Sequence, residues 1–566
     1  MNEQRNLIFA VILSALILFG WSFVAEHYFP TANEPSTKAA DGKQAPAKTA
    51  APTAGGAAAI RNRDVVIRET PRIRIETPRL QGSINLKGAR IDDLVLVTHG
   101  ERLASDSAPI RILSPAGTPD ANFASFGWTG EGLALPGPDT LWTASADRLA
   151  PGAPVTLSWS NTQGQTFQIR LSVDDGYLFD VQQNVANRSG GAVAVKPYGL
   201  ISRVGESKDA DSWTIHTGPI GVFGGKANYD VDFSTLREEG DQRFTSNGGW
   251  LGFTDKYWLT ALVPPQDAGV EAAFRAGSNN SYQADIATAP GIVAPGKAVS
   301  YESRLFAGAK EVALLDRYEK DLGIRHFDKA IDWGWFYWFE RPIYSVLHWL
   351  FRMIGNFGVA IMGLTLLVRL IMFPIAQKQF ASMAAMRVVQ PKMKAIQERY
   401  KDDKQKQQQE ILKLYQAEKV NPMAGCLPIL IQIPIFYALY KVLLLSVEMR
   451  HQPFALWIKD LSAPDPLTPV NLFGLLPFTP PAVIAIGILP ILVGFTSWLQ
   501  FKLNPAPSDP VQKQVFSIMP WAFVFIMAPF AAGLQLYWVT NNVLTILQQK
   551  WLYSRHPGMK AAADAQ

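Results

Sequence analysis

A positively charged side chain interrupts one of the best membrane-spanning runs of this chain. Residues 358–376, GVAIMGLTLLVRLIMFPIA, are long enough to cross a bilayer and include Arg369. An arginine near the bilayer centre costs roughly 2.5–3.5 kcal/mol on insertion-based scales, so it usually faces a bundle interior or a watery cavity. Arg369 also lies about seven residues, or about 10 Å of helix, before the end of the run. Extension of its side chain to the lipid headgroups is therefore the competing interpretation.

Five more apolar runs approach or reach bilayer-spanning length, so the sequence predicts a six-span α-helical membrane bundle. The first run is about 19 residues long, which exceeds the apolar region of most signal peptides, and no small-residue cleavage motif follows it. A membrane anchor is therefore favoured over a cleaved signal peptide. The expected spans are residues 7–25, 358–376, 421–447, 482–501, 515–529 and 533–552.

Changes in composition along the chain mark its expected domains. One early segment is rich in Ala, Pro, Thr and Lys and lacks large apolar side chains, which is typical of a disordered linker. Short alternating segments separated by Gly, Pro, Asn and Asp follow it and predict a large β-sandwich. The expected domains are an anchor at 1–30, the linker at 31–60, the β-sandwich with a closing helix at 61–325, an interfacial helix at 331–354, a five-span core at 355–555 and a short tail at 556–566.

The predicted β-sandwich offers little catalytic chemistry. His99 and His216 are the only histidines between residues 61 and 308. Neither a nucleophile motif nor a carboxylate pair at a recognisable spacing accompanies them. The single cysteine of the chain, Cys426, permits neither a disulfide nor a cysteine metal cluster. We therefore expect no catalytic residue, no metal site and no cofactor, and we interpret the domain as structural or as a binding surface.

Basic residues in the short loops predict the orientation in the membrane. Residues 377–420 carry ten lysines and arginines, whereas residues 448–481 carry only Arg450 and Lys459. The first loop is then cytoplasmic and the second external. With six spans, both termini are cytoplasmic and the β-sandwich is periplasmic, which places the chain in the inner membrane of a bacterium with two membranes.

The cytoplasmic loop is expected to form a helical hairpin. Asp402 or Asp403 supplies an N-cap for its second helix. Met383, Met386 and Met393 recur at helical spacing and form either the seam of the hairpin or a soft apolar surface that accepts varied segments. The basic outer face is suited to anionic lipid headgroups or to ribosomal RNA.

Residues 331–354 combine several aromatic side chains with Arg341 and Arg352. Their apolar side chains recur on one helix face, which predicts an amphipathic helix lying in the membrane interface with its aromatics at headgroup depth. A lid packed on the β-sandwich is the competing interpretation.

Polar side chains recur inside the predicted spans and are candidates to line a wet cavity around Arg369. An ion-coupled transporter would be expected to carry carboxylates at this depth, but the only acidic residue at a span is Glu448, at an outer end. A lone positive charge instead suits the attraction of an acidic or polar stretch of polypeptide. The candidate lining residues are Thr365, Gln432, Gln500, Ser517, Gln535, Tyr537, Thr540, Asn541 and Asn542.

Four blocks follow one another in the C-terminal half: LTLLVRLIMFPIAQKQFASMAAMRVVQPKMKAIQERYKDD, LYQAEKVNPMAGCLPILIQIPIFYALYKVL, RHQPFALWIKDLSAPDP and GLQLYWVTNNVLTILQQKWLY. Through them, nearly all of residues 333–553 resembles the YidC/Oxa/Alb family of membrane protein insertases, in its Gram-negative form. The β region is more loosely similar to the periplasmic domain of that family, through a GGW block and PGKAVSYESRLFAGAKE. The resemblance implies a β-sandwich similar to galactose mutarotases and without known enzymatic activity.

The resemblance also implies a function and a set of partners. Newly made inner-membrane proteins would enter a hydrophilic groove that contains Arg369 and is open to lipid, with Thr365 and Trp538 lining it or touching substrate. The hairpin would receive substrate and contact the ribosome or the signal recognition particle pathway, and the Sec translocon would be a partner. No DNA partner is implied. The tail at 556–566 is short and weakly basic, so the hairpin rather than the tail is expected to serve the ribosome.

Overall fold

The fold is described from a computed structural model. It describes residues 61–104, 106–208, 215–418, 427–476, 478, 480–481, 484–503 and 510–555. The predicted first span and the linker lie outside these residues, as does the tail.

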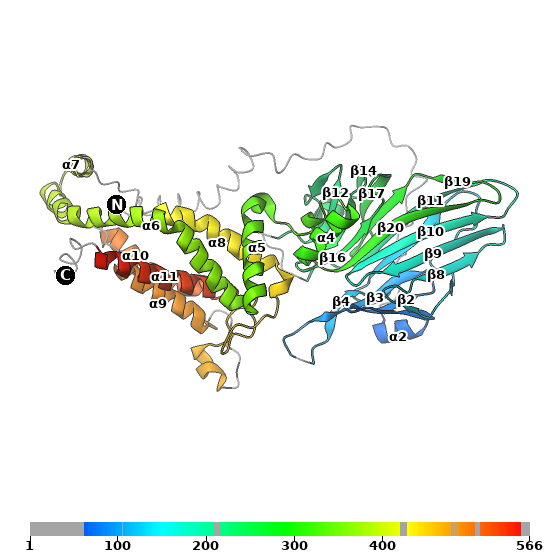
Figure 1. Cartoon of the computed structure of the whole chain (residues 1–566), viewed down its shortest axis with the longest axis horizontal. Coiled ribbons are helices and arrows are strands. Elements are labelled where there is room, and N and C mark those ends of the chain that lie inside the picture. Colours follow the sequence, from blue (N-terminus) through cyan, green and yellow to red (C-terminus); the bar gives the residue numbers. More distant parts are fainter. Residues whose placement is uncertain are drawn as a thin grey trace. The chain divides into compact units, whose positions relative to one another are not determined.

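Residues 72–309 form two large, almost wholly antiparallel sheets (Figure 1). Among the described residues, the first sheet has eleven strands, in the order β14-β17-β18-β11-β5-β3-β2-β1-β7, with β19 and β4 pairing beside β11 and β3. Its strands are β1 (Arg72–Glu76), β2 (Leu80–Asn85), β3 (Arg90–Gly100), β4 (Pro109–Leu113), β5 (Asn122–Thr129), β7 (Arg148–Leu149), β11 (Val193–Val204), β14 (Gln242–Asn247), β17 (Gly269–Ala276), β18 (Ser281–Thr288) and β19 (Gly291–Val293).

The second sheet has nine described strands, in the order β13-β12-β15-β16-β20-β10-β9-β8-β6. Its strand β16 lies against β11 of the first sheet, and β15 lies against β18, so the two sheets form a β-sandwich as predicted. Its strands are β6 (Thr143–Ala144), β8 (Val155–Ser160), β9 (Gln165–Val173), β10 (Leu178–Asn187), β12 (Gly218–Phe223), β13 (Lys226–Asn228), β15 (Trp250–Thr254), β16 (Trp258–Val263) and β20 (Ala298–Ala309).

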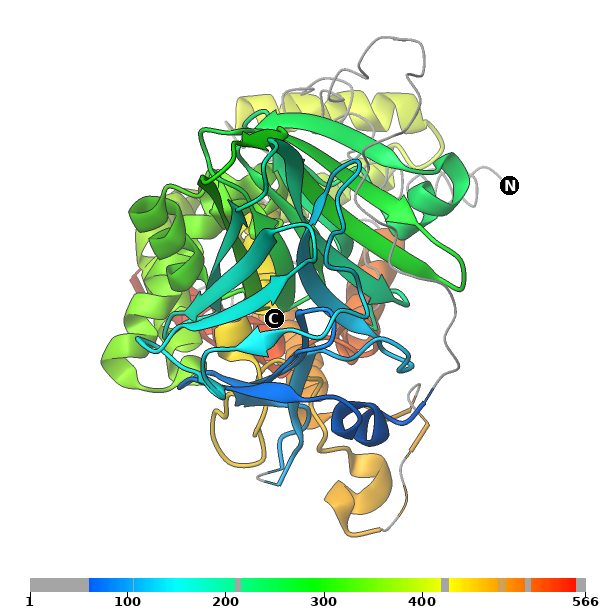
Figure 2. The same ribbon diagram turned by 90° about the vertical axis from the view of Figure 1, so that its right-hand side faces the viewer.

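The alternation of side chains in the sequence explains which strand faces are buried. In β9, Phe167, Ile169 and Leu171 are buried and the residues between them are more exposed, as expected for a strand with one face on a core. Two short helices accompany the strands, α2 (Arg63–Arg68) and α3 (Phe233–Glu239). Helix α2 lies beside the early strands in both views (Figure 1, Figure 2).

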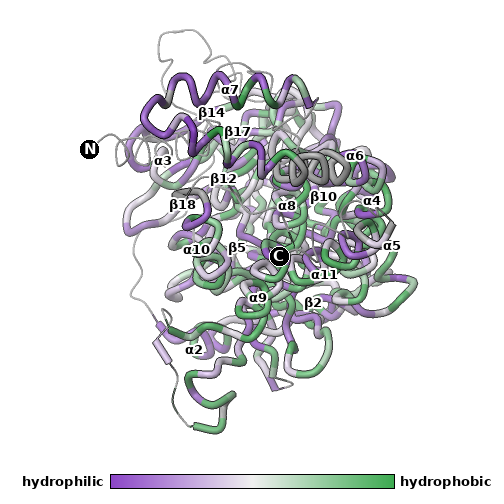
Figure 3. Tube along the Cα trace, turned by 90° about the vertical axis from the view of Figure 1, so that its left-hand side faces the viewer, coloured by the Kyte–Doolittle hydropathy of each residue, from purple (hydrophilic) through white to green (hydrophobic). Residues whose placement is uncertain are grey.

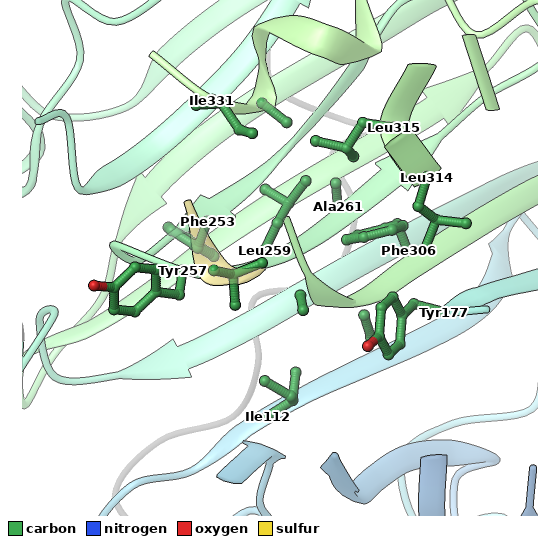
Figure 4. Close-up of a cluster of buried hydrophobic side chains, with 14 of the residues drawn as sticks. Ile112, Tyr177, Phe253, Tyr257, Leu259, Ala261, Phe306, Leu314, Leu315 and Ile331 are labelled. Carbon is green, nitrogen blue, oxygen red and sulfur yellow. The ribbon is translucent and has the colours of Figure 1, made fainter. Parts of the chain in front are cut away.

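A longer helix, α4 (Val312–Leu322), closes the sandwich after its last strand. Leu314 and Leu315 of α4 point toward the second sheet near Phe306 of β20 (Figure 4). The ring of Phe306 lies 5.3 Å from that of Phe327, edge to face, so the buried core continues beyond α4. The structure thus packs residues after 325, the predicted end of the domain, into the same core.

The C-terminal half is helical, and its helices differ in polarity. Figure 3 shows α7 mainly in hydrophilic colours and α8 mainly in hydrophobic ones. The helices are α5 (Tyr337–Ile354), α6 (Phe357–Arg399), α7 (Lys404–Ala417), α8 (Leu427–Leu445), α9 (Ile488–Leu503), α10 (Pro510–Met527) and α11 (Ala532–Arg555), with 3-10 turns η2 (Phe327–Ala330), η3 (Gly334–Phe336), η5 (Val447–Met449) and η6 (Pro469–Gly474).

Within the described residues, one helical segment, Phe357–Lys378, is long and apolar enough to cross a membrane by itself. Shorter apolar helices occupy Gln432–Leu445, Ile488–Leu503 and Lys513–Met527. Each falls on a predicted span, while the count of six spans stays a prediction.

A single helix contains both the Arg369 span and the first part of the predicted hairpin. Helix α6 runs for 43 residues, and both Pro374 and Pro391 lie inside it. After Tyr400 the chain turns, and the Asp403 side chain accepts a hydrogen bond from the Lys406 backbone N–H at 3.0 Å. Asp403 is therefore the N-cap of α7, one of the two residues that the sequence offered for this role.

Helix α5 is shorter than the predicted 331–354 segment. It begins at Tyr337, because the preceding residues form the 3-10 turn η3. It packs against α6 and α8, and its buried side includes Ile343 and Leu347. Its position at a membrane interface stays a prediction.

One buried carboxyl group on α5 predicts a dependence of stability on pH. Glu340 is fully buried and neither of its carboxylate oxygens has a hydrogen-bond partner. Burial raises the pKa of Glu340 from its ordinary 4.5 to about 8, with Asp332 adding to the shift and Lys441 opposing it. Between these two values the unfolded chain has released the proton that the folded chain keeps, so stability falls as pH rises.

We therefore expect the melting temperature of the purified full chain in detergent to fall between about pH 5 and pH 8, where this carboxyl group titrates. Glu340→Gln should flatten that slope, because an amide does not titrate. Glu302→Gln, at an exposed position on β20, is the control and should leave the slope unchanged. Equal slopes in the parent chain and in Glu340→Gln would contradict the assignment.

Candidate functional site

The guanidinium of Arg369 binds the last helix of the chain. Its Nε and Nη2 atoms donate to the Asn541 side-chain oxygen at 2.9 and 2.7 Å. Nη2 also donates to the hydroxyl of Thr545 and, at 3.4 Å, to the Asn541 backbone carbonyl. The half-buried side chain thus points from α6 to α11 instead of extending freely along its own helix.

The partners of Arg369 are neutral. No ion pair to Arg369 is found in the part of the chain that the structure describes. Amide, hydroxyl and carbonyl oxygens orient the guanidinium with charge-assisted hydrogen bonds, yet they leave its formal charge uncompensated. The site therefore keeps a positive charge available to a negatively charged or polar group.

A single face of α11 supplies these partners. Tyr537, Asn541 and Thr545 are four residues apart, which places them on one side of a helix. Gln432 of α8 donates a hydrogen bond to the Tyr537 hydroxyl. The polar face of α11 therefore contacts both α6 and α8, and it brings together four of the predicted lining residues, Arg369, Gln432, Tyr537 and Asn541.

A second polar cluster joins α11 to α9. The Asn542 side-chain nitrogen donates to Thr496 and Ser497 hydroxyls, each at 3.0 Å, and all three residues are buried. Sequence reasoning missed Thr496, Ser497 and Thr545. The pattern that could have indicated Thr545 is its position one turn after Asn541, on the same helix face.

Three of the other predicted lining residues lie apart from these two clusters. Thr365 is 1% exposed and its hydroxyl donates to the Ile361 carbonyl of its own helix at 2.7 Å. Gln500 is half-buried near the end of α9, and Ser517 is exposed on α10, where its hydroxyl donates to Gln514. Among the described residues, no hydrogen bond joins any of these three side chains to Arg369, and their roles stay predictions.

Trp538 is half-buried beside the polar face of α11. Its ring lies 5.0 Å from that of Phe436 on α8 and 5.5 Å from that of Phe523 on α10. An aromatic side chain packed on two other helices is held in a defined place while part of it stays accessible. Its predicted contact with substrate is not tested by this packing.

Of the methionine stripe, only Met393 has a described side chain. It is buried, and the Tyr415 hydroxyl of α7 donates to its sulfur at 3.0 Å. This contact favours the seam interpretation at Met393. The side chains of Met383 and Met386 lie outside the described residues.

Two family models together span almost the whole described chain. Residues 72–346 match the YidC periplasmic domain, and residues 349–560 match the 60Kd inner membrane protein. The two matches define a membrane protein in which a periplasmic domain is joined to an inner-membrane domain. The chain belongs to the YidC family.

Curated relatives match this chain over nearly their whole length. A membrane protein insertase YidC of Zymomonas mobilis is 52% identical over 558 residues, covering 98% of this chain and 96% of the relative. That of Methylobacterium radiotolerans is 43% identical over 594 residues, covering 99% of this chain and 96% of the relative.

Among solved structures, an active YidC insertase with its first transmembrane domain resolved is 18% identical and covers 85% of this chain and 92% of its own, with a TM-score of 0.37. A galactose mutarotase related enzyme from Lactobacillus acidophilus is 11% identical and covers 42% of this chain and 97% of its own, with a TM-score of 0.31.

Proposed function

We propose that this chain inserts newly made inner-membrane proteins into the bilayer and helps them fold, by way of a hydrophilic groove that contains Arg369 and is open to lipid. The observation that carries the proposal is the guanidinium of Arg369 held between α6 and α11 by neutral oxygens. Family membership supports the same activity, since the relatives are named membrane protein insertases.

The mechanism rests on the cost of moving polar segments through lipid. Each charged residue that crosses a hydrocarbon layer faces a barrier of several kcal/mol. Hydrogen-bonding groups along part of that path replace some of the lost water, and a fixed positive charge attracts acidic segments. Release of the substrate sideways into lipid is then driven by burial of its own apolar span. This mechanism implies no covalent step, nucleotide or metal.

Partners and orientation follow from the charge distribution. The basic segment 377–420 is assigned to the cytoplasm, where it receives substrate and contacts the ribosome or the signal recognition particle pathway. Anionic lipids bind its outer face. The chain acts alone or beside the Sec translocon, as a six-span protein with cytoplasmic termini and a periplasmic β-sandwich. Helix α5 lies in the periplasmic interface.

Removal of the β-sandwich tests an alternative function, in which the β-sandwich binds or modifies sugar and the helices only anchor it in the membrane. Because Phe327 packs on Phe306, the deletion should extend from residue 61 to residue 330 so that Phe327 is removed together with the core against which it packs. An insertase is expected to keep most of its activity after this deletion, scored as insertion of a small two-span substrate into proteoliposomes. Complete loss of insertion by a folded deletion variant would contradict the assignment of function to the helical core.

A further inference from the structure

A histidine and two carboxylates meet where the closing helix of the β-sandwich ends. Glu319 lies in the last turn of α4, His326 directly precedes η2, and Asp328 lies within η2. One potential ligand atom from each lies within 4.8 Å of the other two. The spacing of these residues matches no metal-binding motif, so the sequence alone predicts no site here.

Asp328 supplies an independent reason to expect a ligand. Its side chain is 7% exposed, and its Oδ1 atom is buried without a hydrogen-bond partner. Its Oδ2 atom accepts from the Tyr337 hydroxyl at 2.9 Å and lies 3.8 Å from the ammonium of Lys329. Buried carboxylate oxygens are normally satisfied, so an Oδ1 atom without a protein donor indicates either a bound cation or a proton shared with the neighbouring Glu319 carboxyl group.

The loop that carries these residues is held in place by the core. Gly323 ends α4 with a φ of 66°, and His326 also has a positive φ of 51°. Between them and Asp328, Phe327 is fully buried, with its ring edge-on to Trp250 at 5.5 Å. The Asp328 backbone N–H donates to Glu319 at 3.1 Å, which fixes the two acidic residues beside each other.

We propose that Glu319, His326 and Asp328 bind a divalent cation of the zinc class. One imidazole and two carboxylates make three protein ligands and leave a fourth position for water. Their two negative charges exceed the single positive charge of Lys329, which lies 3.8 Å from Asp328, so the cluster attracts a cation. The Tyr337 hydroxyl on Oδ2 orients Asp328 as an outer hydrogen-bond partner.

Binding requires a modest movement. Ligand atoms of a tetrahedral zinc site lie about 3.4 Å apart, so those separated by as much as 4.8 Å must approach each other. His326 is exposed, and rotation of its ring supplies this movement without disturbing the core. The site ties the end of α4 to the segment that leads into α5 and is independent of the groove around Arg369.

The test is calorimetric titration of zinc chloride into the full chain in detergent, after removal of metals with a chelator. One saturable equivalent is expected. His326→Ala and Glu319→Gln should each weaken binding by about 10-fold or more. His451→Ala, at a histidine that faces Asp460 elsewhere in the chain, is the matched control and should bind as the parent does.

A second measurement does not depend on the folding of variants. Diethyl pyrocarbonate modifies exposed histidines, and one equivalent of zinc should slow modification of His326 in the unaltered chain. Absence of saturable binding, unchanged affinity in both ligand variants or unchanged modification of His326 would each overturn the proposal. A proton shared by the two carboxylates would then account for the free oxygen of Asp328.

Discussion

Arg369→Ala should lower the insertion of a small substrate with an acidic translocated segment by about tenfold or more. Loss of about 1.4 kcal/mol of attraction at the limiting step slows that step about tenfold. The guanidinium of Arg369 places a positive charge at the contact between α6 and α11. The measurement is insertion in cells depleted of the native protein, scored by protease protection of the translocated segment.

Two further variants separate charge from geometry. Arg369→Lys keeps the charge but cannot bind Asn541 and Thr545 through a planar fork, so partial activity is expected. Arg352→Ala removes an arginine from α5, away from the polar face of α11, and serves as the control. Full activity of both Arg369 variants would remove charge attraction from the mechanism.

Photocrosslinking from Trp538 to a stalled nascent chain tests whether substrate contacts the protein beside the polar face of α11.

The second large effect is on the stability of the β-sandwich. Phe306 is fully buried on β20 and lies near the rings of Tyr177, Tyr318 and Phe327. Phe306→Ala removes most of this packing and leaves a cavity, which costs about 3–5 kcal/mol. Amide hydrogen exchange in β10, β16 and β20 of the full chain should accelerate by about 100-fold or more, since each 1.4 kcal/mol corresponds to tenfold.

Ile292→Ala is the matched control for this variant. Ile292 is 74% exposed on β19, so its truncation should change the local stability by less than about 0.5 kcal/mol. Equal exchange rates in the two variants would show that the Phe306 cluster does not hold the sandwich together.

Local patterns determined much of this architecture. Alternating apolar residues in segments such as β9 predict strands with one buried face, because successive side chains point to opposite faces of a strand. Long apolar runs predict the helices of the core, because a membrane span needs about 20 apolar residues. The N-cap at Asp403 follows from the residue type and its position before a helical segment. The free-energy cost of placing Arg369 in a membrane span was also evident, because a charged residue within an apolar run can be recognised from the sequence alone.

The tertiary structure determines which distant residues contact one another. Asn541 and Thr545 lie 172 and 176 residues after Arg369, and the packing of α6 against α11 brings them to its guanidinium. Helix α6 continues through Pro374 and Pro391, although a proline inside a helix usually kinks or ends it. The cluster of Glu319, His326 and Asp328 likewise exists because the buried Phe327 folds a turn back onto α4. Sequence determines periodicity and the placement of charge along the chain, whereas contacts between distant residues depend on packing in three dimensions.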